Sequence, residues 1–363
     1  MMRSLFPAHR RRNHENNDFE PITELWVDER QSLFEAISTG GWHWIYPMKD
    51  FLYMRDLIID CYRKIEVNCQ SHALDEMSTG FNELDSMIGG LSWGELVIIG
   101  GHARMGKTTL ALDIARHAAT DTDRNGRIAI LSLNKSEADI PMRLLAAEAR
   151  VELNRILSGR LLSAQRWRRL ASASGRLAES DIVLGCFPNM SLQELREKLI
   201  SFQEKNSSLD LVIIDDLQSM NDWHVAIDHK RKLYELMEGL HSMAEDLDVA
   251  LIIVSELSRA QDERPDKRPK LTDFPEYGPI ELLRFDNMEA DVVPFEGFPM
   301  EEFASNILLL YREEVFHPRH KGQVKTELTV AQSIADEIGT ITLWFHPDFI
   351  SFSGNTCIDS VIR

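Results

Sequence analysis

The chain has 363 residues, with 40 lysines and arginines against 58 aspartates and glutamates, which gives a formal net charge of −18. Apolar residues make up 44% and charged residues 27%, values that exclude a disordered or fibrous chain. The acidic balance argues against a broad basic surface that coats nucleic acid, although it is compatible with a local basic channel.

The cysteines and the apolar runs describe the environment that the sequence suits. The four cysteines are scattered without a CxxC pair, which favours free thiols in a reducing cytoplasm over a disulfide framework. The longest apolar runs are far shorter than the roughly 18 residues that a membrane-spanning helix needs. We therefore expect a cytoplasmic protein that does not contact a membrane.

Two segments come first in chain order. Residues 1–20 carry four arginines among polar residues, and they predict a disordered basic tail. Residues 21–77 are rich in aromatic residues, and apolar side chains recur at helical spacing between Met48 and Ile65. This pattern predicts a helical N-terminal or linker segment, which packs either on its own domain or on a neighbouring subunit.

From residue 78 onward, short apolar runs alternate with longer helical stretches. Near-continuous apolar strands separated by helices indicate an α/β domain whose mostly parallel sheet is covered on both faces. Two late runs lie close together and predict a terminal β-hairpin, at residues 327–330 and 341–345. We assign one domain to residues 78–363. The other predicted strands are 96–100, 127–133, 182–184, 211–214, 250–255 and 307–311.

A phosphate-binding motif lies between the first predicted strand and a predicted helix at Thr109–Ala119. Residues 101–108 read GHARMGKT and fit the pattern GxxxxGK[ST]. The backbone N–H groups of such a loop surround phosphates, and the helix N-terminus adds positive potential. Lys107 is expected at the β- and γ-phosphates and Thr108 at Mg²⁺. The predicted nucleotide-binding residues are Gly101, His102, Ala103, Arg104, Met105, Gly106, Lys107, Thr108 and Thr109.

A carboxylate motif follows about a hundred residues later. The apolar run 211–214 ends in Asp215 and Asp216. A carboxylate at the end of a parallel strand beside a phosphate loop can hold the Mg²⁺ shell. We therefore expect Asp215 to be the second Mg²⁺ residue, together with Thr108.

Several blocks in one order resemble the RecA-like C-terminal motor domain of DnaB-type replicative helicases. The resemblance covers about residues 78–352 and implies a RecA-like P-loop NTPase fold that binds ATP and Mg²⁺. It also implies DNA replication as the process, single-stranded DNA as the track, a homo-oligomeric ring such as a hexamer, and other replication proteins as partners. The blocks are STGFNELDSMIGGLSWGELVIIGG (78–101), LSLNKSEADIPMRLLA (131–146), ARVELNRILSGRL (149–161), IIDDLQSM (213–220), SELSR (255–259), DKRPKLTD (266–273) and LLLYREEVFH (308–317).

The resemblance also assigns roles to single residues. Lys107 and Asp215 match the nucleotide and metal positions, and Gln218 matches the polar residue that links the nucleotide site to the DNA loops. Asn134 stands where the family has the glutamate that activates water. An amide can hold a water molecule but cannot accept its proton, and loss of a general base costs about 10²–10⁴-fold in rate. Glu137, one turn away, is the candidate replacement.

Further positions depart from the family pattern at the subunit and DNA contacts. Gln332 and Ile334 stand where the family has a Lys-x-Arg pair that reaches a neighbour's ATP. Pro275 replaces an arginine that contacts DNA. At the nucleotide, Glu256 replaces a glutamine and puts an extra negative charge near the γ-phosphate. About 77 residues precede the motor, too few for the usual primase-binding domain, so that role is not carried over.

An acidic insertion follows Pro275. Residues 276–302 contain eight acidic residues and one basic residue, which repel a strand of phosphates. A solvated acidic loop and an acidic lid or protein-docking element are both open interpretations. The basic residues still available to DNA just before it are Arg264, Lys267, Arg268 and Lys270.

Two main hypotheses follow for the function. The first is an ATP-dependent DNA helicase or translocase of the DnaB type, which hydrolyses ATP with a turnover that Asn134, Gln332 and Ile334 can impair. The alternative is a catalytically degenerate, helicase-derived ATP-binding protein with a regulatory or scaffold role. A recombinase-like or clock-type ATPase is a third option, which the blocks at 131–146 and 213–220 disfavour.

Overall fold

The structure is a computed structural model, and the residues it describes all belong to one compact unit, Leu74–Arg363. The predicted tail at residues 1–20, and the predicted helical segment at 21–77 except for its last two residues, lie outside the described residues. No described helix is long and apolar enough to cross a membrane. The described ranges are 76–121, 126–134, 138–160, 163–206, 208–224, 229–258, 264–274, 280–286, 289–295, 299–317 and 322–354.

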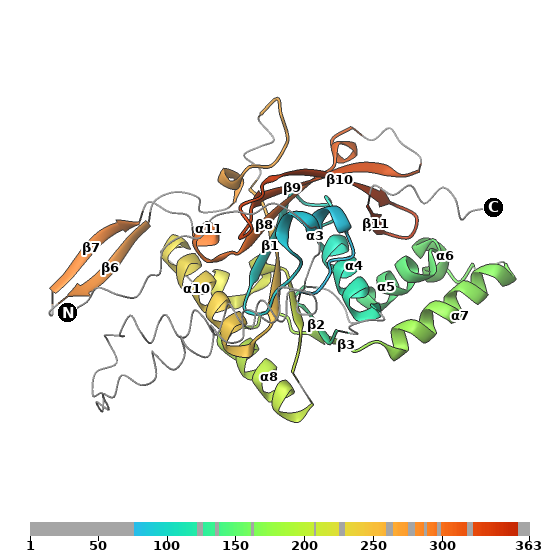
Figure 1. The fold of residues 1–363 in the computed structure, drawn as a ribbon, viewed down its shortest axis with the longest axis horizontal. Helices are drawn as coiled ribbons and strands as arrows, with labels where there is room; N and C mark the ends of the chain where they lie inside the picture. Colours follow the sequence, from blue (N-terminus) through green and yellow to red (C-terminus); the bar gives the residue numbers. More distant parts are fainter. Residues whose placement is uncertain are drawn as a thin grey trace, which may run out of the picture. The chain divides into compact units, whose positions relative to one another are not determined.

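A mixed sheet forms the centre of the unit (Figure 1). Within the described chain it has nine strands in the order β11-β10-β9-β8-β1-β5-β4-β2-β3. The pairs from β8 through to β3 are parallel, and β9, β10 and β11 add antiparallel pairs at the other edge. The strands are β1 (Leu96–Gly101), β2 (Ile128–Ser132), β3 (Ile182–Cys186), β4 (Leu211–Asp215), β5 (Ala250–Glu256), β8 (Asn306–Tyr311), β9 (Val324–Gln332), β10 (Gly339–His346) and β11 (Ser351–Ser353).

Helices cover the sheet and extend beyond it (Figure 1). The α-helices are α3 (Asn82–Ile88), α4 (Lys107–Thr120), α5 (Asp139–Ala149), α6 (Leu153–Leu157), α7 (Ala164–Glu179), α8 (Leu192–Lys205), α9 (Asn221–His224), α10 (His229–Leu247) and α11 (Pro299–Phe303). The short 3₁₀ helices are η1 (Leu217–Ser219), η3 (Leu271–Asp273) and η4 (Glu313–Val315).

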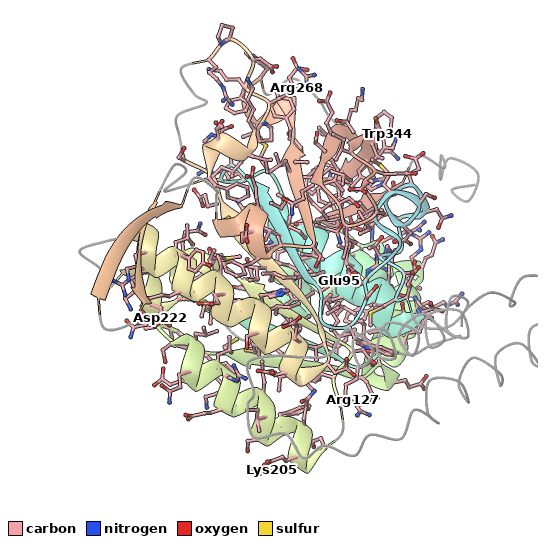
Figure 2. The ribbon with its side chains drawn as sticks, turned by 60° about the vertical axis from the view of Figure 1, so that its left-hand side comes forward. Glu95, Arg127, Lys205, Asp222, Arg268 and Trp344 are labelled. Atoms are coloured by element: carbon pink, nitrogen blue, oxygen red, sulfur yellow. The ribbon has the colours of Figure 1, made fainter. Side chains whose placement is uncertain are left out.

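Alternate residues of the central strand β1 pack into two different layers. Val97 lies in a hydrophobic cluster that includes Ile114 of α4, and Ile98 lies in a second cluster that includes Leu240 of α10. Figure 2 shows α8 and α10 side by side on their face of the sheet. Each fully buried aliphatic side chain contributes about 1.5–3 kcal/mol. The near-continuous apolar runs in the sequence therefore form strands that are buried on both faces.

The structure confirms the predicted fold class, a mostly parallel α/β sheet with a terminal hairpin. β9 and β10 pair antiparallel from Gly339 opposite Val330 to Phe345 opposite Val324. The predicted strands all appear, with ends that differ by a few residues. The three-residue strand β11 was not predicted, because its antiparallel partner β10 and not a periodic pattern defines it.

The acidic insertion contains regular structure that the sequence analysis did not predict. β6 (Ile280–Asp286) and β7 (Glu289–Phe295) form a separate antiparallel pair. Acidic residues interrupt the two short apolar runs that form these strands, so the sequence pattern did not predict them. The backbone of this part of the insertion is therefore a hairpin and not an irregular loop, and Pro275 lies outside the described residues.

The parallel register brings several loops to one edge of the sheet. Ser132 of β2 lies opposite Asp215 of β4, and Gly101 of β1 lies opposite Glu256 of β5. Parallel strands end at the same edge, so the segments that follow β1, β2, β4 and β5 all meet there. Ligands of open α/β sheets bind at this edge, which contains the phosphate loop.

Candidate functional site

The phosphate loop joins the carboxyl end of β1 to the start of α4. Gly106 has a φ of +101°, a backbone conformation that glycine adopts without strain. A Cβ atom at this position would lie 2.9 Å from the ring of Phe352. Arg104 also has a positive φ, +67°, and its side chain is exposed. These conformations reverse the chain so that α4 begins at Lys107, with its first backbone N–H groups at the loop.

Lys107 is anchored within the loop. Its side chain is buried, and Nζ donates hydrogen bonds to the carbonyl oxygens of Gly101 (2.7 Å) and His102 (2.9 Å). These contacts place an ammonium group at the mouth of the loop, where it can neutralise phosphate charge. Of the other predicted residues, Gly101, His102, Met105 and Thr109 are buried, and Ala103 is exposed.

Thr108 and Asp215 meet across the edge of the sheet. The Thr108 hydroxyl donates to the Asp215 carboxylate, at 2.9 Å to Oδ1 and 3.1 Å to Oδ2. Asp215 is only 3% exposed, at the end of β4. A hydroxyl and a carboxylate are hard oxygen ligands of the kind that Mg²⁺ prefers, so these two residues fit the metal that the fold family implies.

Gln218 connects the ends of two neighbouring strands. It lies on η1, directly after β4, and its Nε2 donates to the Ser255 hydroxyl (3.0 Å) and to the Glu256 carbonyl oxygen (3.1 Å). Its Oε1 accepts from the Glu256 backbone N–H at 3.0 Å. The amide therefore ties the segment after β4 to the end of β5.

Asn134 lies beside a second carboxylate. Asn134 is exposed directly after β2, and its Nδ2 donates to Oδ2 of Asp216 at 2.7 Å and to the Ser219 hydroxyl at 3.4 Å. Oδ1 of Asp216 accepts from the Ser219 backbone N–H (2.9 Å) and hydroxyl (2.6 Å). Glu137, the predicted replacement base, lies outside the described residues.

An arginine directly after β8 supports the loop from outside. Nη2 of Arg312 donates to the Arg104 carbonyl oxygen at 2.6 Å, and its guanidinium lies 4.0 Å from the ring centroid of Phe345. Arg312 is buried, and burial lowers its pKa. The rings of Phe345 and Phe352 are in turn 5.1 Å apart. The C-terminal strands thus support the phosphate loop through one cation–π contact and one charged hydrogen bond.

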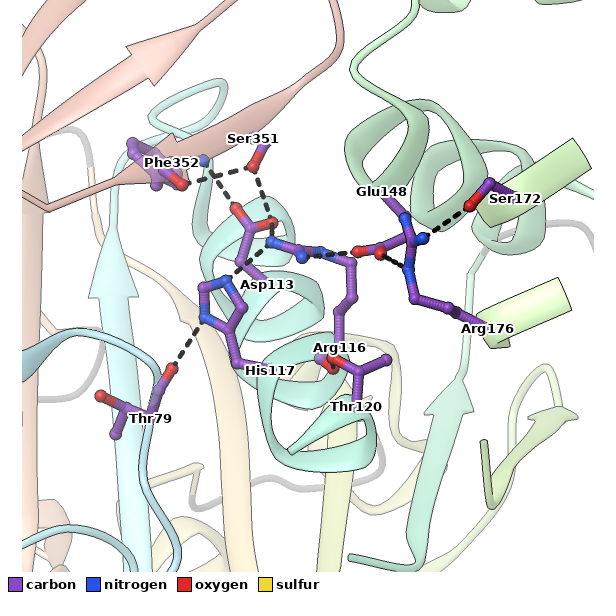
Figure 3. Close-up of polar contacts among 10 residues, drawn as sticks. All are labelled: Thr79, Asp113, Arg116, His117, Thr120, Glu148, Ser172, Arg176, Ser351 and Phe352. Atoms are coloured by element: carbon purple, nitrogen blue, oxygen red, sulfur yellow. Dashed lines mark hydrogen bonds and ion pairs between the residues drawn. The ribbon is translucent and has the colours of Figure 1, made fainter. Parts of the chain in front are cut away.

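Behind the loop, Asp113 ties α4 to β11 (Figure 3). Asp113 is 1% exposed and accepts from the Phe352 backbone N–H (2.6 Å), the Ser351 hydroxyl (2.9 Å) and Nη2 of Arg116 (3.2 Å). Burial raises the pKa of Asp113, whereas Arg116 and the two hydrogen bonds from β11 oppose that rise. The helix α4, which starts at the predicted phosphate-binding residue Lys107, is therefore anchored to β11.

The same polar network extends to α5, α7 and the segment before α3 (Figure 3). Glu148 of α5 accepts from Arg116 (2.9 Å) and from Arg176 of α7 (2.5 Å). His117 accepts from Arg116 at 2.8 Å and contacts the Thr79 carbonyl oxygen at 3.2 Å. Burial and the neighbouring Arg116 lower the pKa of His117 to about 4. The imidazole is therefore neutral at pH 7, and it links the guanidinium to the segment before α3.

In the hairpin, Gln332 and Ile334 stand at the two positions where the family pattern has cations. Nε2 of Gln332 donates to the carbonyl oxygens of Glu301 (2.9 Å) and Ala304 (2.7 Å), beside α11. Ile334, at the turn between β9 and β10, is 63% exposed. Lys325 is exposed on β9, whereas Arg319 and Lys321 lie outside the described residues.

Two of the basic residues expected at DNA are held in ion pairs. Arg264 binds Asp273 through both terminal nitrogens, at 2.8 and 2.7 Å. Arg268, labelled in Figure 2, also binds Glu327 of β9 through two nitrogens, Nε at 2.6 Å and Nη2 at 3.0 Å. Lys270 is exposed. Phosphates that bind here would compete with these carboxylates for both arginines.

Comparison with known proteins now identifies the domain. A family model described as the DnaB-like helicase C-terminal domain matches residues 76–354. The chain belongs to this family. The resemblance stated from the motif blocks is thereby confirmed.

Relatives of this DnaB-like domain include two bacterial proteins. The chain is 29% identical over 304 residues to the replicative DNA helicase DnaB of Geobacillus stearothermophilus, and 30% identical over 304 residues to the replicative DNA helicase DnaC of Bacillus subtilis (strain 168). In both cases 83% of this chain and 62% of the relative are covered, so the chain spans about six tenths of the length of these relatives.

Solved structures share the fold of this DnaB-like domain. The ATPase domain of G40P superposes with a TM-score of 0.67 at 24% identity, covering 84% of this chain and 99% of that one. A DnaB-like replicative helicase, studied with its primase interactions, superposes with a TM-score of 0.68 at 24% identity, covering 90% and 72%. The RecA-like fold prediction is therefore confirmed.

Sequence reasoning missed four residues that the structure places at the site. Two of them, Arg312 and Phe352, are remote from the phosphate loop in sequence. The third, Asp113, lies close to the loop in sequence but belongs to no motif. Only the folded chain therefore shows that all three lie at the site. Asp216 carried a readable signal, because a second carboxylate directly follows the metal-binding candidate Asp215.

Proposed function

We propose that the chain is an ATP-driven DNA helicase or translocase of the DnaB type, which moves along single-stranded DNA during replication as a homo-oligomeric ring such as a hexamer. The observation that carries this proposal is the contact of Thr108 with Asp215 beside the loop-bound Lys107, in a domain of the DnaB-like family. The names of the two bacterial relatives, both replicative DNA helicases, support it. Other replication proteins are the proposed partners.

The residues of the loop supply most of the binding chemistry in this proposal. Backbone N–H groups and the N-terminus of α4 face the phosphates, and Lys107 neutralises charge at the β- and γ-phosphates. Thr108 and Asp215 would hold Mg²⁺, which when bound neutralises the charge that develops on the phosphate oxygens. Preorganised groups of this kind are the main source of catalysis in phosphoryl transfer.

Gln218 provides a route by which the nucleotide site and the DNA loops are coupled. Its three hydrogen bonds join the segment after the metal-binding strand β4 to the end of β5. The polypeptide that follows β5 includes the basic stretch expected at DNA. A nucleotide-dependent shift near Asp215 would therefore move that stretch, which is the motion a translocase needs.

The residues of the hairpin formed by β9 and β10 bear on the expected rate of ATP hydrolysis. An arginine supplied across a subunit interface accelerates phosphoryl transfer by about 10³–10⁵-fold where it has been measured. Gln332 and Ile334 bring no positive charge to those positions. We therefore expect turnover well below that of a ring motor with both cations in place.

Measurement of ATP hydrolysis with and without single-stranded DNA tests the proposal. The expected result is DNA-stimulated turnover that Lys107→Ala abolishes, together with a ring-sized mass in the presence of ATP and DNA. Turnover equal to that of Lys107→Ala, in a protein that still binds ATP, would refute the motor and favour the regulatory or scaffold alternative. A monomer without DNA-stimulated turnover would also refute it.

A further inference from the structure

ATP hydrolysis requires an acceptor for the proton of the attacking water, and the sequence offers only an amide at the expected position, Asn134. Within the described residues, three carboxylates lie at the carboxyl ends of β4 and β5: Asp215, Asp216 and Glu256. Asp215 is buried and binds the Thr108 hydroxyl, so it is committed to the metal side of the site. Glu137, the replacement base that the sequence suggests, lies outside the described residues, so Asp216 and Glu256 are the described carboxylates that can receive the proton.

The geometry points to Asp216 as the general base, and we propose that it replaces the missing glutamate. This inference rests on the proposed function. Asp216 directly follows Asp215, and its Oδ2 lies 2.7 Å from the amide nitrogen of Asn134. The amide at the end of β2 is thus joined to a carboxylate at the end of the neighbouring strand β4. The family pattern has its carboxylate after β2, at position 134, whereas this chain has the carboxylate of Asp216 after the adjacent strand β4.

A count of hydrogen bonds shows where a water molecule can be held. An ionised carboxylate offers about two acceptor sites on each oxygen. Oδ1 of Asp216 uses both on Ser219, whereas Oδ2 accepts one bond, from Asn134, within the described part of the chain. The remaining site on Oδ2 and the carbonyl oxygen of Asn134 can together accept both hydrogens of one water. Asn134 is exposed and Asp216 is half-buried, so solvent reaches the pair.

In the proposed step, the attacking water displaces ADP from the γ-phosphorus. The water oxygen forms a bond to the γ-phosphorus, and the bond between that phosphorus and the β–γ bridging oxygen breaks. The electron pair of the broken bond leaves with ADP. The water proton passes to Oδ2 of Asp216 and is later released to solvent, so ATP and water give ADP, phosphate and one proton. Asn134 holds the water and does not change its protonation state.

Glu256 is the rival carboxylate. Its backbone N–H and carbonyl oxygen are both bound by Gln218, at the end of β5. β5 lies on the far side of β4 from β2, so Glu256 is separated from Asn134 by a strand. Asp216, by contrast, already contacts the amide that stands at the family's base position.

Substitutions at Asp216 separate a proton acceptor from a structural cap. Asp216 also caps η1 through the Ser219 N–H, and serine caps helices comparably well but cannot act as a base. We expect Asp216→Asn and Asp216→Ser each to lower DNA-stimulated kcat by about 10²–10⁴-fold, with the affinity for ATP unchanged. Adding Asn134→Glu to Asp216→Asn should restore turnover. The double variant still has one carboxylate and one amide in the contact between positions 134 and 216, with the two groups exchanged. Asp181→Asn, directly before β3 and therefore at the opposite edge of the sheet from the loop, is the matched control and should keep wild-type turnover.

The outcomes distinguish this inference from the proposed function. If the wild type hydrolyses ATP and Asp216→Ser does so at a similar rate, Asp216 is only a cap and the inference is wrong. It is also wrong if ATP affinity falls in step with turnover, or if Glu256→Gln abolishes turnover while Asp216→Ser does not. If the wild type shows only the background of Lys107→Ala, the proposed motor function itself fails and no base operates.

Discussion

Substitution of Asp113 by alanine tests how far the C-terminal strand β11 stabilises α4, the helix that follows the phosphate loop. The substitution leaves the Phe352 N–H and the Ser351 hydroxyl without their buried acceptor, and it removes one of the two carboxylates that contact Arg116. A hydrogen bond to a charged group contributes about 1.5–3 kcal/mol, and a buried N–H that is left unpaired costs about 1–3 kcal/mol. Arg116 keeps Glu148, which limits the loss. We therefore expect the free energy of unfolding to fall by about 3–5 kcal/mol.

Denaturant unfolding of wild type, Asp113→Ala and Ser351→Ala measures this loss. Ser351→Ala removes one hydroxyl donor and should cost about 1 kcal/mol, so it is the matched control. The double variant should lose less than the sum of the two single losses, because both substitutions break the same hydrogen bond. A loss below about 1 kcal/mol for Asp113→Ala would refute the reasoning, since it would mean that water or another donor replaces the contact to β11.

Three further predictions concern His117, Gly106 and Gln218. Because the pKa of His117 is lowered to about 4, the unfolded chain takes up a proton below about pH 6.5 that the folded chain does not. As the pH is lowered from about 6.5 to about 4, the free energy of unfolding should therefore fall by up to about 1.4 kcal/mol per pH unit. The difference in this free energy between wild type and His117→Gln measures the effect. A difference that does not depend on pH contradicts the prediction. Gly106→Ala, with φ +101° and a Cβ 2.9 Å from Phe352, should destabilise the domain by at least about 1 kcal/mol and abolish nucleotide binding in a fluorescent-ATP titration. Its control, Gly175→Ala on α7, has open space at the Cβ position and should be neutral or stabilising. Gln218→Ala should retain basal ATP turnover and lose its stimulation by single-stranded DNA, and stimulation equal to that of the wild type would argue against the coupling role.

Local pattern predicted most of the fold. The strand at Leu96–Gly101 is apolar at nearly every position and precedes a glycine-rich loop, so strand, loop and helix were all evident from the sequence. β6 and β7 were not predicted, because acidic residues interrupt their apolar pattern. β11 was not predicted because a three-residue strand carries no period and exists only through pairing with β10.

The sequence by itself predicted which chemical groups the protein offers to a nucleotide. GHARMGKT and the carboxylate after the run 211–214 predict the loop and metal residues, because each of these motifs is local in the sequence. Only the tertiary structure decided which of these groups meet. Thr108 and Asp215 are 107 residues apart, and Asn134 and Asp216 are 82 apart. The parallel register of β1, β2, β4 and β5 brings them to one edge, and no local pattern in the sequence specifies that register.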